Sequence, residues 1–220
     1  MKSVIFDFNG TLFWDSQLHI DTWKEYSKKL RDVPFSEEEM LKYMFGHTNE
    51  DIVEYAIGKK PDKALVDKVA AEKEAEYRQM CLNRPEDFHL APHAEEFLDY
   101  LKAKNIPMNI ATMSEWCNVE FYIKEFSLAR WFDIDKIAYS DGTLPGKPAP
   151  DIYLIAARNI GVEMKDCTVF EDAIAGIESA RRAGAGEIIA VASREPVEYY
   201  KNIQGVSKII TDFEQVCINI

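Results

Sequence analysis

The chain has 220 residues, which is long for one domain and short for two, so its length fits a core domain with a smaller insertion. Hydrophobic residues make up 47% of it, enough to fill a packed core, which excludes a disordered chain. The formal net charge of −12 disfavours nucleic acid and anionic membrane surfaces as partners. An anionic substrate would therefore need local positive charge or a metal ion at its site.

The cysteines and the N-terminus bear on the compartment. The four cysteines are scattered and form no CxxC pair, so we expect reduced, mostly buried thiols in a cytosolic protein. The opening MKSVIFDF is too short for the apolar region of a signal peptide, and no run approaches the roughly 18 apolar residues of a membrane span. We therefore expect a soluble, cytoplasmic protein, and a monomer, since no long exposed apolar stripe stands out.

The first part of the chain predicts one strand followed by a helical block. Residues 4–6 indicate a buried strand, and the turn that follows contains Gly10. From about residue 16 to about residue 80 the pattern is helical, with a capping box at Ser36 and Glu39. Residues 63–80 are highly charged and amphipathic, which predicts an exposed helix. No strand is predicted in this block.

After Pro85 the pattern changes to alternating strands and helices. The predicted strands cover residues 107–112, 167–170 and 188–192, and the predicted helices cover residues 92–104, 151–159 and 173–183. This alternation predicts an α/β fold with a doubly wound, mostly parallel sheet that has helices on both faces. The chain is then divided into a core domain, residues 1–14 and 86–220, and an inserted helical cap domain, residues 15–85.

Polar side chains follow the predicted strands at the points where the strands end. They are Asp7, Asn9, Thr112, Ser114, Glu171 and Asp172, and Lys147 lies in a loop. Because parallel strands bring their carboxyl ends to one edge of the sheet, where ligands bind, we expect these residues to converge. A carboxylate can act as a nucleophile, oxygen ligands suit Mg²⁺, and ammonium and hydroxyl groups can stabilise a transferring phosphoryl group. Singly, each residue is also consistent with a helix cap, a turn or an ordinary surface position.

The strand-end residues and Lys147 lie in four short motifs. They are residues 6–12 (FDFNGTL), residues 110–114 (IATMS), residues 146–151 (GKPAPD) and residues 169–177 (VFEDAIAGI). In this order, the motifs resemble those of the haloacid dehalogenase superfamily of hydrolases, in its capped β-phosphoglucomutase-like phosphatase branch. The likeness covers nearly the whole chain. The resemblance implies a Rossmann-like core whose inserted cap closes over the substrate.

The resemblance also implies a role for each matching residue. Asp7 would attack phosphorus, and Thr112 and Lys147 would hold the phosphoryl group. The Mg²⁺ ligands would be Asp7, the backbone carbonyl of Asn9, Asp172 and, in or near the metal shell, Glu171. The residues expected to contact substrate are Ser114 in the core and His19, Gly46, His47 and Thr48 in the cap. For His19, packing within its helix is an equal alternative.

The chain departs from this family pattern at Asn9, where the family usually has a second aspartate that protonates the leaving group and then activates water. An amide cannot exchange a proton in that role, and the loss of such help costs on the order of 10²–10⁴ in rate. Three explanations remain open: a native residue in a slow or non-catalytic protein, an engineered change, or a proton supplied by another group such as His19 or His47.

Several residues also bear on other branches of the superfamily and on other functions. The retained Glu171–Asp172 pair argues against dehalogenases, which need no Mg²⁺, and Lys42 as a Schiff-base lysine is less probable than a surface lysine. The loop at residues 45–50 contains no Lys or Arg that could clamp a second phosphate. A Mg²⁺-dependent phosphatase acting on a small phosphorylated metabolite is therefore preferred. The alternatives are a catalytically silent protein that binds a phosphorylated ligand, and a sugar-phosphate mutase.

Overall fold

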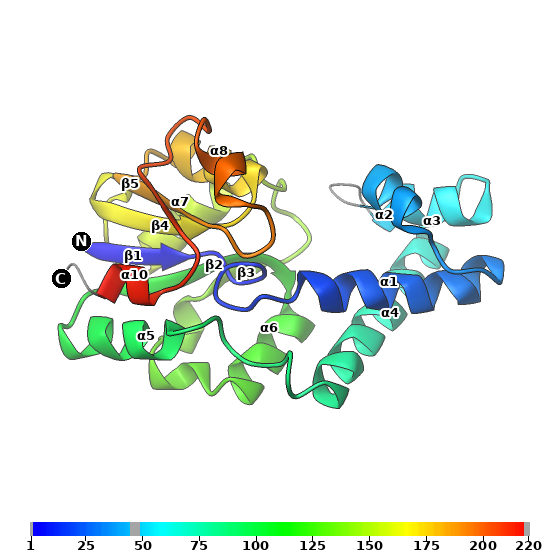
Figure 1. Ribbon diagram of the computed structural model, residues 1–220, viewed down its shortest axis with the longest axis horizontal. Coiled ribbons are helices and arrows are strands. Elements are labelled where there is room, and N and C mark those ends of the chain that lie inside the picture. Colours follow the sequence, from blue (N-terminus) through cyan, green and yellow to red (C-terminus); the bar gives the residue numbers. More distant parts are fainter. Residues whose placement is uncertain (1, 45–48, 218–220) are drawn as a thin grey trace. The chain divides into compact units, whose positions relative to one another are not determined.

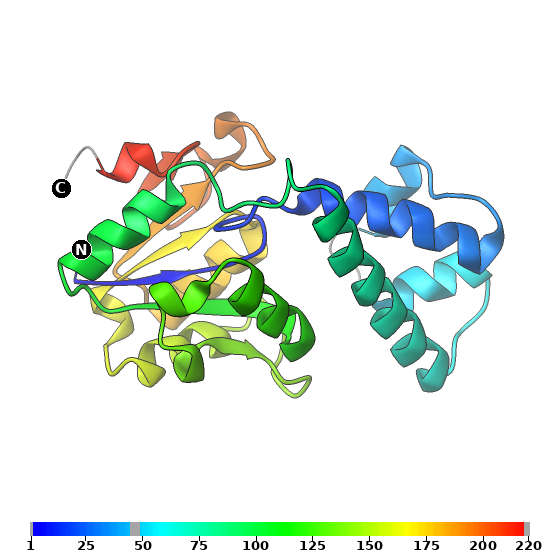
Figure 2. The ribbon, with the colours of Figure 1, turned by 90° about the horizontal axis from the view of Figure 1, so that it is seen from below.

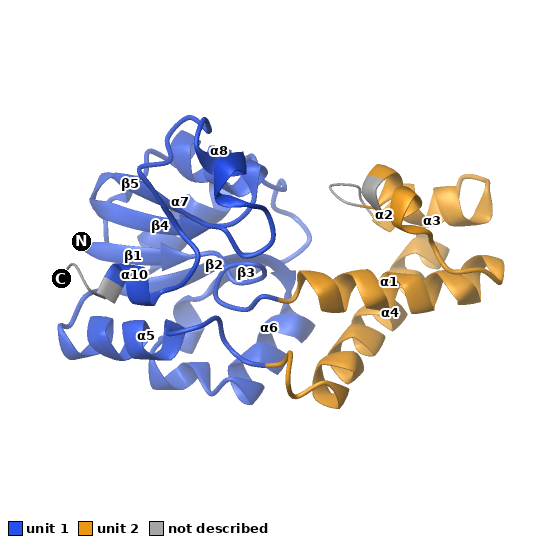
Figure 3. Cartoon of the chain, in the orientation of Figure 1, with its two compact units in different colours: residues 1–14, 89–220 blue, residues 15–88 orange. Residues whose placement is uncertain are grey.

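The computed structural model describes residues 2–44 and 49–217. The chain forms two compact units, one of residues 1–14 and 89–220 and one of residues 15–88 (Figure 3). The second crossing between the units follows Phe88, slightly beyond the expected position after residue 85.

The larger unit contains a six-stranded sheet in the order β3-β2-β1-β4-β5-β6, and all neighbouring strands are parallel (Figure 1). The strands are β1 (Ser3–Phe6), β2 (Met108–Glu115), β3 (Ala138–Ser140), β4 (Cys167–Glu171), β5 (Glu187–Val191) and β6 (Lys208–Ile210). The predicted α/β class with a parallel sheet is therefore confirmed.

Strand β1 lies between β2 and β4, pairing Val4 with Met108 and with Thr168. Val4, Ile5 and Phe6 are completely buried. A strand covered on both faces needs a continuous apolar run rather than alternation, and this short run provides it. The central position of β1 brings the residue that follows it, Asp7, to the middle of the sheet's carboxyl edge.

Helices cover both faces of the sheet. Helices α5 and α6 lie on one face, and α7 and α8 lie on the other (Figures 1 and 2). The helices of this unit are α5 (Ala94–Ala103), α6 (Trp116–Glu125), α7 (Asp151–Asn159), α8 (Ile174–Ala183), α9 (Val197–Tyr200) and α10 (Glu214–Cys217). Aromatic rings fill the α5 side, where Phe6 stacks on Phe170 at 5.1 Å and Phe97 stacks on Phe213 at 5.8 Å. The doubly wound arrangement is thus confirmed.

The smaller unit is helical in its described residues. Its helices are α1 (Ser16–Arg31), α2 (Glu37–Tyr43), α3 (Asn49–Ile57) and α4 (Lys63–Asn83). The expected capping box is present at the start of α2, because Ser36 and Glu39 each accept a backbone N–H from the other. Helix α4 is mostly exposed or half-buried, as its amphipathic pattern predicted, and its buried face includes Val69, Lys73 and Tyr77.

The sequence-based elements differ from the structure in two further ways. Strand β2 continues to Glu115, so Thr112 and Ser114 lie within the strand rather than after it. Helix α6, the short helices α9 and α10 and the short strands β3 and β6 were not predicted.

Of the cysteine side chains that are described, Cys81 and Cys167 are buried and Cys117 is exposed. Within the described residues, no helix combines the length and apolar character needed to cross a membrane.

Candidate active site

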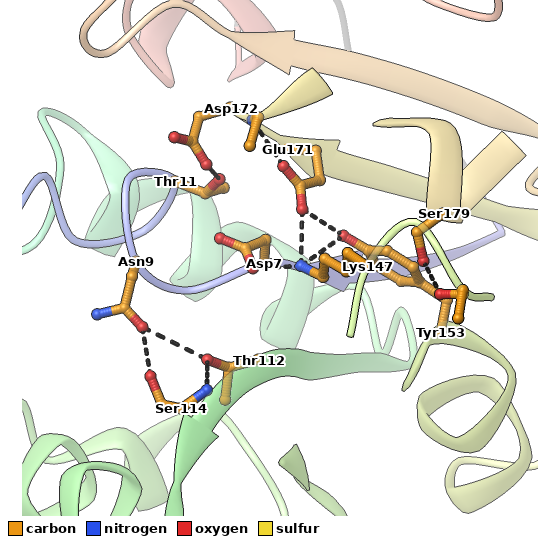
Figure 4. A network of polar contacts seen from close by, with 12 residues as sticks. Asp7, Asn9, Thr11, Thr112, Ser114, Lys147, Tyr153, Glu171, Asp172 and Ser179 are labelled. Atoms are coloured by element: carbon orange, nitrogen blue, oxygen red, sulfur yellow. Dashed lines mark hydrogen bonds and ion pairs between the residues drawn. The ribbon is translucent and has the colours of Figure 1, made fainter. Parts of the chain in front are cut away.

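The candidate site is built on the carboxyl ends of the two central strands. Asp7 follows β1 directly, Glu171 is the last residue of β4, and Asp172 comes next. Figure 4 shows these carboxylates converging with Lys147, which a loop brings to the same edge. The peptide bond between Lys147 and Pro148 is cis.

Lys147 bridges two of the carboxylates. Its Nζ lies 2.6 Å from Asp7 Oδ1 and 2.7 Å from Glu171 Oε1. The side chains of Lys147 and Asp7 are each 10% exposed, and that of Glu171 is 1% exposed. The Tyr153 hydroxyl donates to Glu171 Oε1 over 3.0 Å and lies 3.3 Å from the same ammonium. The Lys147 ammonium is therefore held in place by groups from β1, β4 and α7.

The pKa values of this group follow from burial and from charge. Burial opposes the charge on Lys147, but the Asp7 and Glu171 carboxylates hold its pKa above the ordinary value. Burial raises the pKa of Asp172 well above its ordinary value, and the neighbouring carboxylates of Glu171 and Asp7 add to that effect. Burial, followed by the charge of Glu171, raises the pKa of Tyr153. Lys147 remains an ammonium, while the carboxylates repel one another.

Three carboxylates facing one ammonium leave an excess of negative charge, which a divalent cation would balance. Asp7, Glu171 and Asp172 each offer a carboxylate oxygen, and these atoms lie within 4.8 Å of one another. Carboxylate oxygens are the ligands that Mg²⁺ prefers. The donor set therefore fits Mg²⁺, which these three residues could hold.

The turn after β1 keeps Asp172 in this group. Thr11 Oγ1 donates to Asp172 Oδ1 over 3.2 Å. Gly10 has a φ of +80°, and a Cβ there would overlap the Asp172 carboxylate, so the close approach requires glycine. On the other side, the buried Tyr200 donates its hydroxyl to the backbone carbonyl of Asp172 over 2.7 Å. The backbone and side chain of Asp172 are thus fixed from two directions.

Asn9 belongs to a second polar group, next to the carboxylates in Figure 4. The hydroxyl of Ser114 donates to Asn9 Oδ1 over 2.7 Å, and Thr112 Oγ1 lies 3.4 Å from the same oxygen. Asn9 Nδ2 donates to the hydroxyl of Tyr122 over 2.9 Å. The Thr112 hydroxyl also accepts the backbone N–H of Ser114 over 3.1 Å. These contacts set the orientation of the Asn9 amide.

The residues predicted for the helical unit are placed differently. His19 lies in α1, with Nε2 3.1 Å from Asp15 Oδ2 and Nδ1 3.1 Å from Lys73 Nζ. Its ring stacks on Tyr77 at 4.0 Å. Both ring nitrogens therefore have partners inside the helical unit, and a substrate contact by His19 stays a prediction. The other three residues predicted there, Gly46, His47 and Thr48, lie outside the described residues.

Sequence reasoning missed four contributors to the site, which are Thr11, Tyr122, Tyr153 and Tyr200. Tyr153 and Tyr122 lie on the buried faces of α7 and α6, where a tyrosine is usually core. The only sequence signal for Tyr153 is its position two residues after Asp151, which ends the third motif. Thr11 lies within the first motif, but the sequence did not indicate that it contacts Asp172.

The fold and the site together define a doubly wound α/β protein with a buried carboxylate–lysine centre at the carboxyl edge of its sheet. The model of the haloacid dehalogenase-like hydrolase family matches residues 1–184. The chain therefore belongs to the haloacid dehalogenase-like hydrolases, as its motifs predicted.

Individual relatives support this assignment. The chain is 30% identical to beta-phosphoglucomutase from Bacillus subtilis, over 84% of this chain and 80% of that protein. It is 29% identical to the fructose-1-phosphate phosphatase YqaB from Escherichia coli, over 82% of this chain and 92% of the relative. A solved structure of a family IA, variant 3 hydrolase from Entamoeba histolytica is 44% identical with a TM-score of 0.91, covering 98% of this chain and 95% of that one.

Proposed function

We propose that this chain is a Mg²⁺-dependent phosphatase that hydrolyses a small phosphorylated sugar through an aspartyl-phosphate on Asp7. The observation that carries the proposal is the 2.6 Å contact between Asp7 Oδ1 and Lys147 Nζ within a buried group of carboxylates. The substrate class is supported by the relatives named for phosphoglucomutase and fructose-1-phosphate phosphatase activity.

In the first step, a carboxylate oxygen of Asp7 forms a bond to phosphorus while the bond between phosphorus and the ester oxygen breaks. The Lys147 ammonium and the Thr112 hydroxyl stabilise charge on the transferring oxygens. Mg²⁺, held by Asp7, Asp172 and Glu171, would neutralise the phosphoryl charge. In the second step, water attacks phosphorus, which releases phosphate and restores the Asp7 carboxylate.

Both steps need a proton transfer, and Asn9 takes the position where the family pattern has an aspartate for it. Its amide is held by Ser114, Thr112 and Tyr122, but it cannot give or take a proton. A good leaving group needs no proton in the first step, whereas water attack does need a base. We therefore expect Asp7 to be phosphorylated by an activated ester faster than the aspartyl-phosphate is hydrolysed.

The test is to mix the protein with p-nitrophenyl phosphate and Mg²⁺ and to follow the first turnovers. The expected result is one equivalent of p-nitrophenol per chain in a burst, followed by slow release. Asn9→Asp should remove the burst and raise steady turnover by roughly 10²–10⁴. The exposed Asn202→Asp is the matched control and should behave like the parent. Asp7→Asn should show neither phase, and persistent turnover in that variant would refute the role of Asp7.

A second candidate is favoured by Asn9 itself: a protein that binds a phosphorylated ligand and does not turn it over. It predicts Mg²⁺-dependent, saturable binding of the ligand with no product over hours, in both the parent and Asn9→Asp. A sugar-phosphate mutase would instead yield an isomerised phosphate, so free phosphate as the sole product would exclude it.

A further inference from the structure

An exposed aromatic pair lies at the carboxyl ends of β2 and β3. Trp116 directly follows β2 and begins α6, and its side chain is 43% exposed. Its ring lies 5.1 Å from that of the half-buried Tyr139 in β3, at an interplanar angle of 47°. Ligands bind at this edge of a parallel sheet. A large exposed aromatic residue here can therefore pack against a ring of the ligand.

The charge around this pair is negative. Glu115, the last residue of β2, immediately precedes Trp116 and is exposed. Asp141, also exposed, lies in the loop after β3. Residues 112–116 and 138–146 include these two acids and contain no Lys or Arg. These two stretches therefore present carboxylates, and no ammonium or guanidinium group, to a second phosphate.

The aromatic pair also lies close, along the chain, to the polar group around Asn9. Ser114 contacts Asn9 in the polar group beside Asp7, and Trp116 comes two residues later. An extended chain advances about 3.3 Å per residue, so the Cα atoms of Ser114 and Trp116 are separated by at most about 7 Å. That distance is close to the width of one sugar ring.

We propose that Glu115, Trp116 and Tyr139 form the subsite for the leaving group, and that this subsite takes an uncharged, hydroxyl-bearing ring and disfavours a second phosphate. The inference rests on the proposed phosphatase function. The aromatic faces pack against the apolar face of the ring, and the Glu115 carboxylate accepts hydrogen bonds from its hydroxyls. The preferred substrate is therefore a sugar monophosphate rather than a bisphosphate.

The experiment compares fructose 1-phosphate with fructose 1,6-bisphosphate, which differ by one phosphate on the same sugar. For Glu115→Lys, we expect kcat/KM for the bisphosphate to rise about three- to tenfold relative to the monophosphate, with a smaller shift at 0.5 M salt because added ions screen exposed charges. Glu120→Lys is the matched control, since it makes the same charge change at an exposed position further along α6. It should leave the ratio near that of the parent.

The aromatic part of the subsite is tested with Trp116→Ala. This variant should lose roughly three- to tenfold in kcat/KM for fructose 1-phosphate, the range of one aromatic contact. It should keep the parent's value for glycerol 1-phosphate, which has no ring. Leu154→Ala, which removes another exposed apolar side chain, is the control and should change neither value.

Turnover of p-nitrophenyl phosphate separates the subsite from the proposed function. If the parent does not turn over this ester, the phosphatase proposal has failed, and the same ratios are then taken from the dissociation constants of the two fructose phosphates measured with Mg²⁺. In either measurement, the quantity compared is the ratio of the bisphosphate value to the monophosphate value. If Glu115→Lys changes this ratio no more than Glu120→Lys does, the charge selection is overturned. An equal loss for fructose 1-phosphate and glycerol 1-phosphate in Trp116→Ala would overturn the ring contact.

Discussion

Replacing Gly176 with alanine should destabilise this protein, although the same change inside a helix is normally favourable. Gly176 is buried in α8, where alanine would gain about 1 kcal/mol from helix propensity. However, the added Cβ would lie closer to the Glu171 carboxylate than the 3.0 Å that real Cβ contacts keep. Because Gly176 belongs to a helix backbone, Glu171 is the group that must move.

The cost follows from what Glu171 would lose. Its carboxylate accepts hydrogen bonds from Lys147 at 2.7 Å, from Tyr153 at 3.0 Å and from the Ala173 backbone at 2.8 Å. Losing two bonds to a charged group costs about 1.5–3 kcal/mol each. After subtracting the propensity gain, the free energy of unfolding should fall by about 2–5 kcal/mol, which corresponds to a fall in Tm of roughly 5–15 °C.

Urea and thermal unfolding, followed by circular dichroism, would measure this effect. Gly146→Ala is the control, because a Cβ at Gly146 meets no atom within 4 Å and its φ is not in the left-handed region. It should change the free energy of unfolding by less than about 0.5 kcal/mol. A Gly176→Ala protein as stable as the parent would refute the packing of Glu171 described above.

Other changes have equally definite outcomes. Tyr200→Phe removes the bond to the Asp172 carbonyl, so the Mg²⁺ dissociation constant measured by calorimetry should rise up to about fivefold, the value of one hydrogen bond, whereas Tyr199→Phe, at an exposed position, should not change it. Lys147→Met should abolish burst and turnover, and added Mg²⁺ should raise its Tm more than that of the parent, because the metal replaces the lost charge; an equal rise would contradict this. Burial raises the pKa of the Cys81 thiol from 9.0 to about 12, so the thiol ionises at lower pH in the unfolded chain than in the folded one. The contribution of this thiol to stability is therefore complete below pH 9 and is lost as the pH rises towards 12. Cys81→Ala should flatten the decline of the unfolding free energy in urea melts over that range, and an unchanged slope would contradict the assignment.

The sequence predicted the parts of the fold that have strong local patterns. Residues 4–6, 167–170 and 188–192 are apolar runs long enough to indicate buried strands, and the structure places β1, β4 and β5 there. Strands β3 and β6 have three residues each and lie at the two ends of the sheet, so their pairing depends on their neighbours more than on their own composition. Neither strand has the unbroken apolar run of residues 4–6, because β3 ends in Ser140 and β6 begins with Lys208.

The same distinction applies to the candidate site. Asp7, Glu171 and Asp172 could be grouped from the sequence because a parallel sheet brings all its carboxyl ends to one edge. Tyr122 and Tyr153 could not, since the periodicity of a helix shows which side is buried but not which polar atom lies opposite. The contact between Tyr122 and Asn9 joins residues 113 positions apart, and such a pairing is determined only by the packing of α6.

The central position of β1 also bears on how the chain folds as it is synthesised. Val4 pairs with Met108 on one side and Thr168 on the other, so β1 gains both neighbours only after residue 168 has been synthesised. Forming contacts between residues so distant in sequence requires the closure of long loops, which slows folding. The helices of residues 15–88 make their internal contacts within a much shorter stretch and can form while the rest is still being made. Strand β1, which directly precedes Asp7, therefore stays without one of its two neighbours until residue 168 has been made.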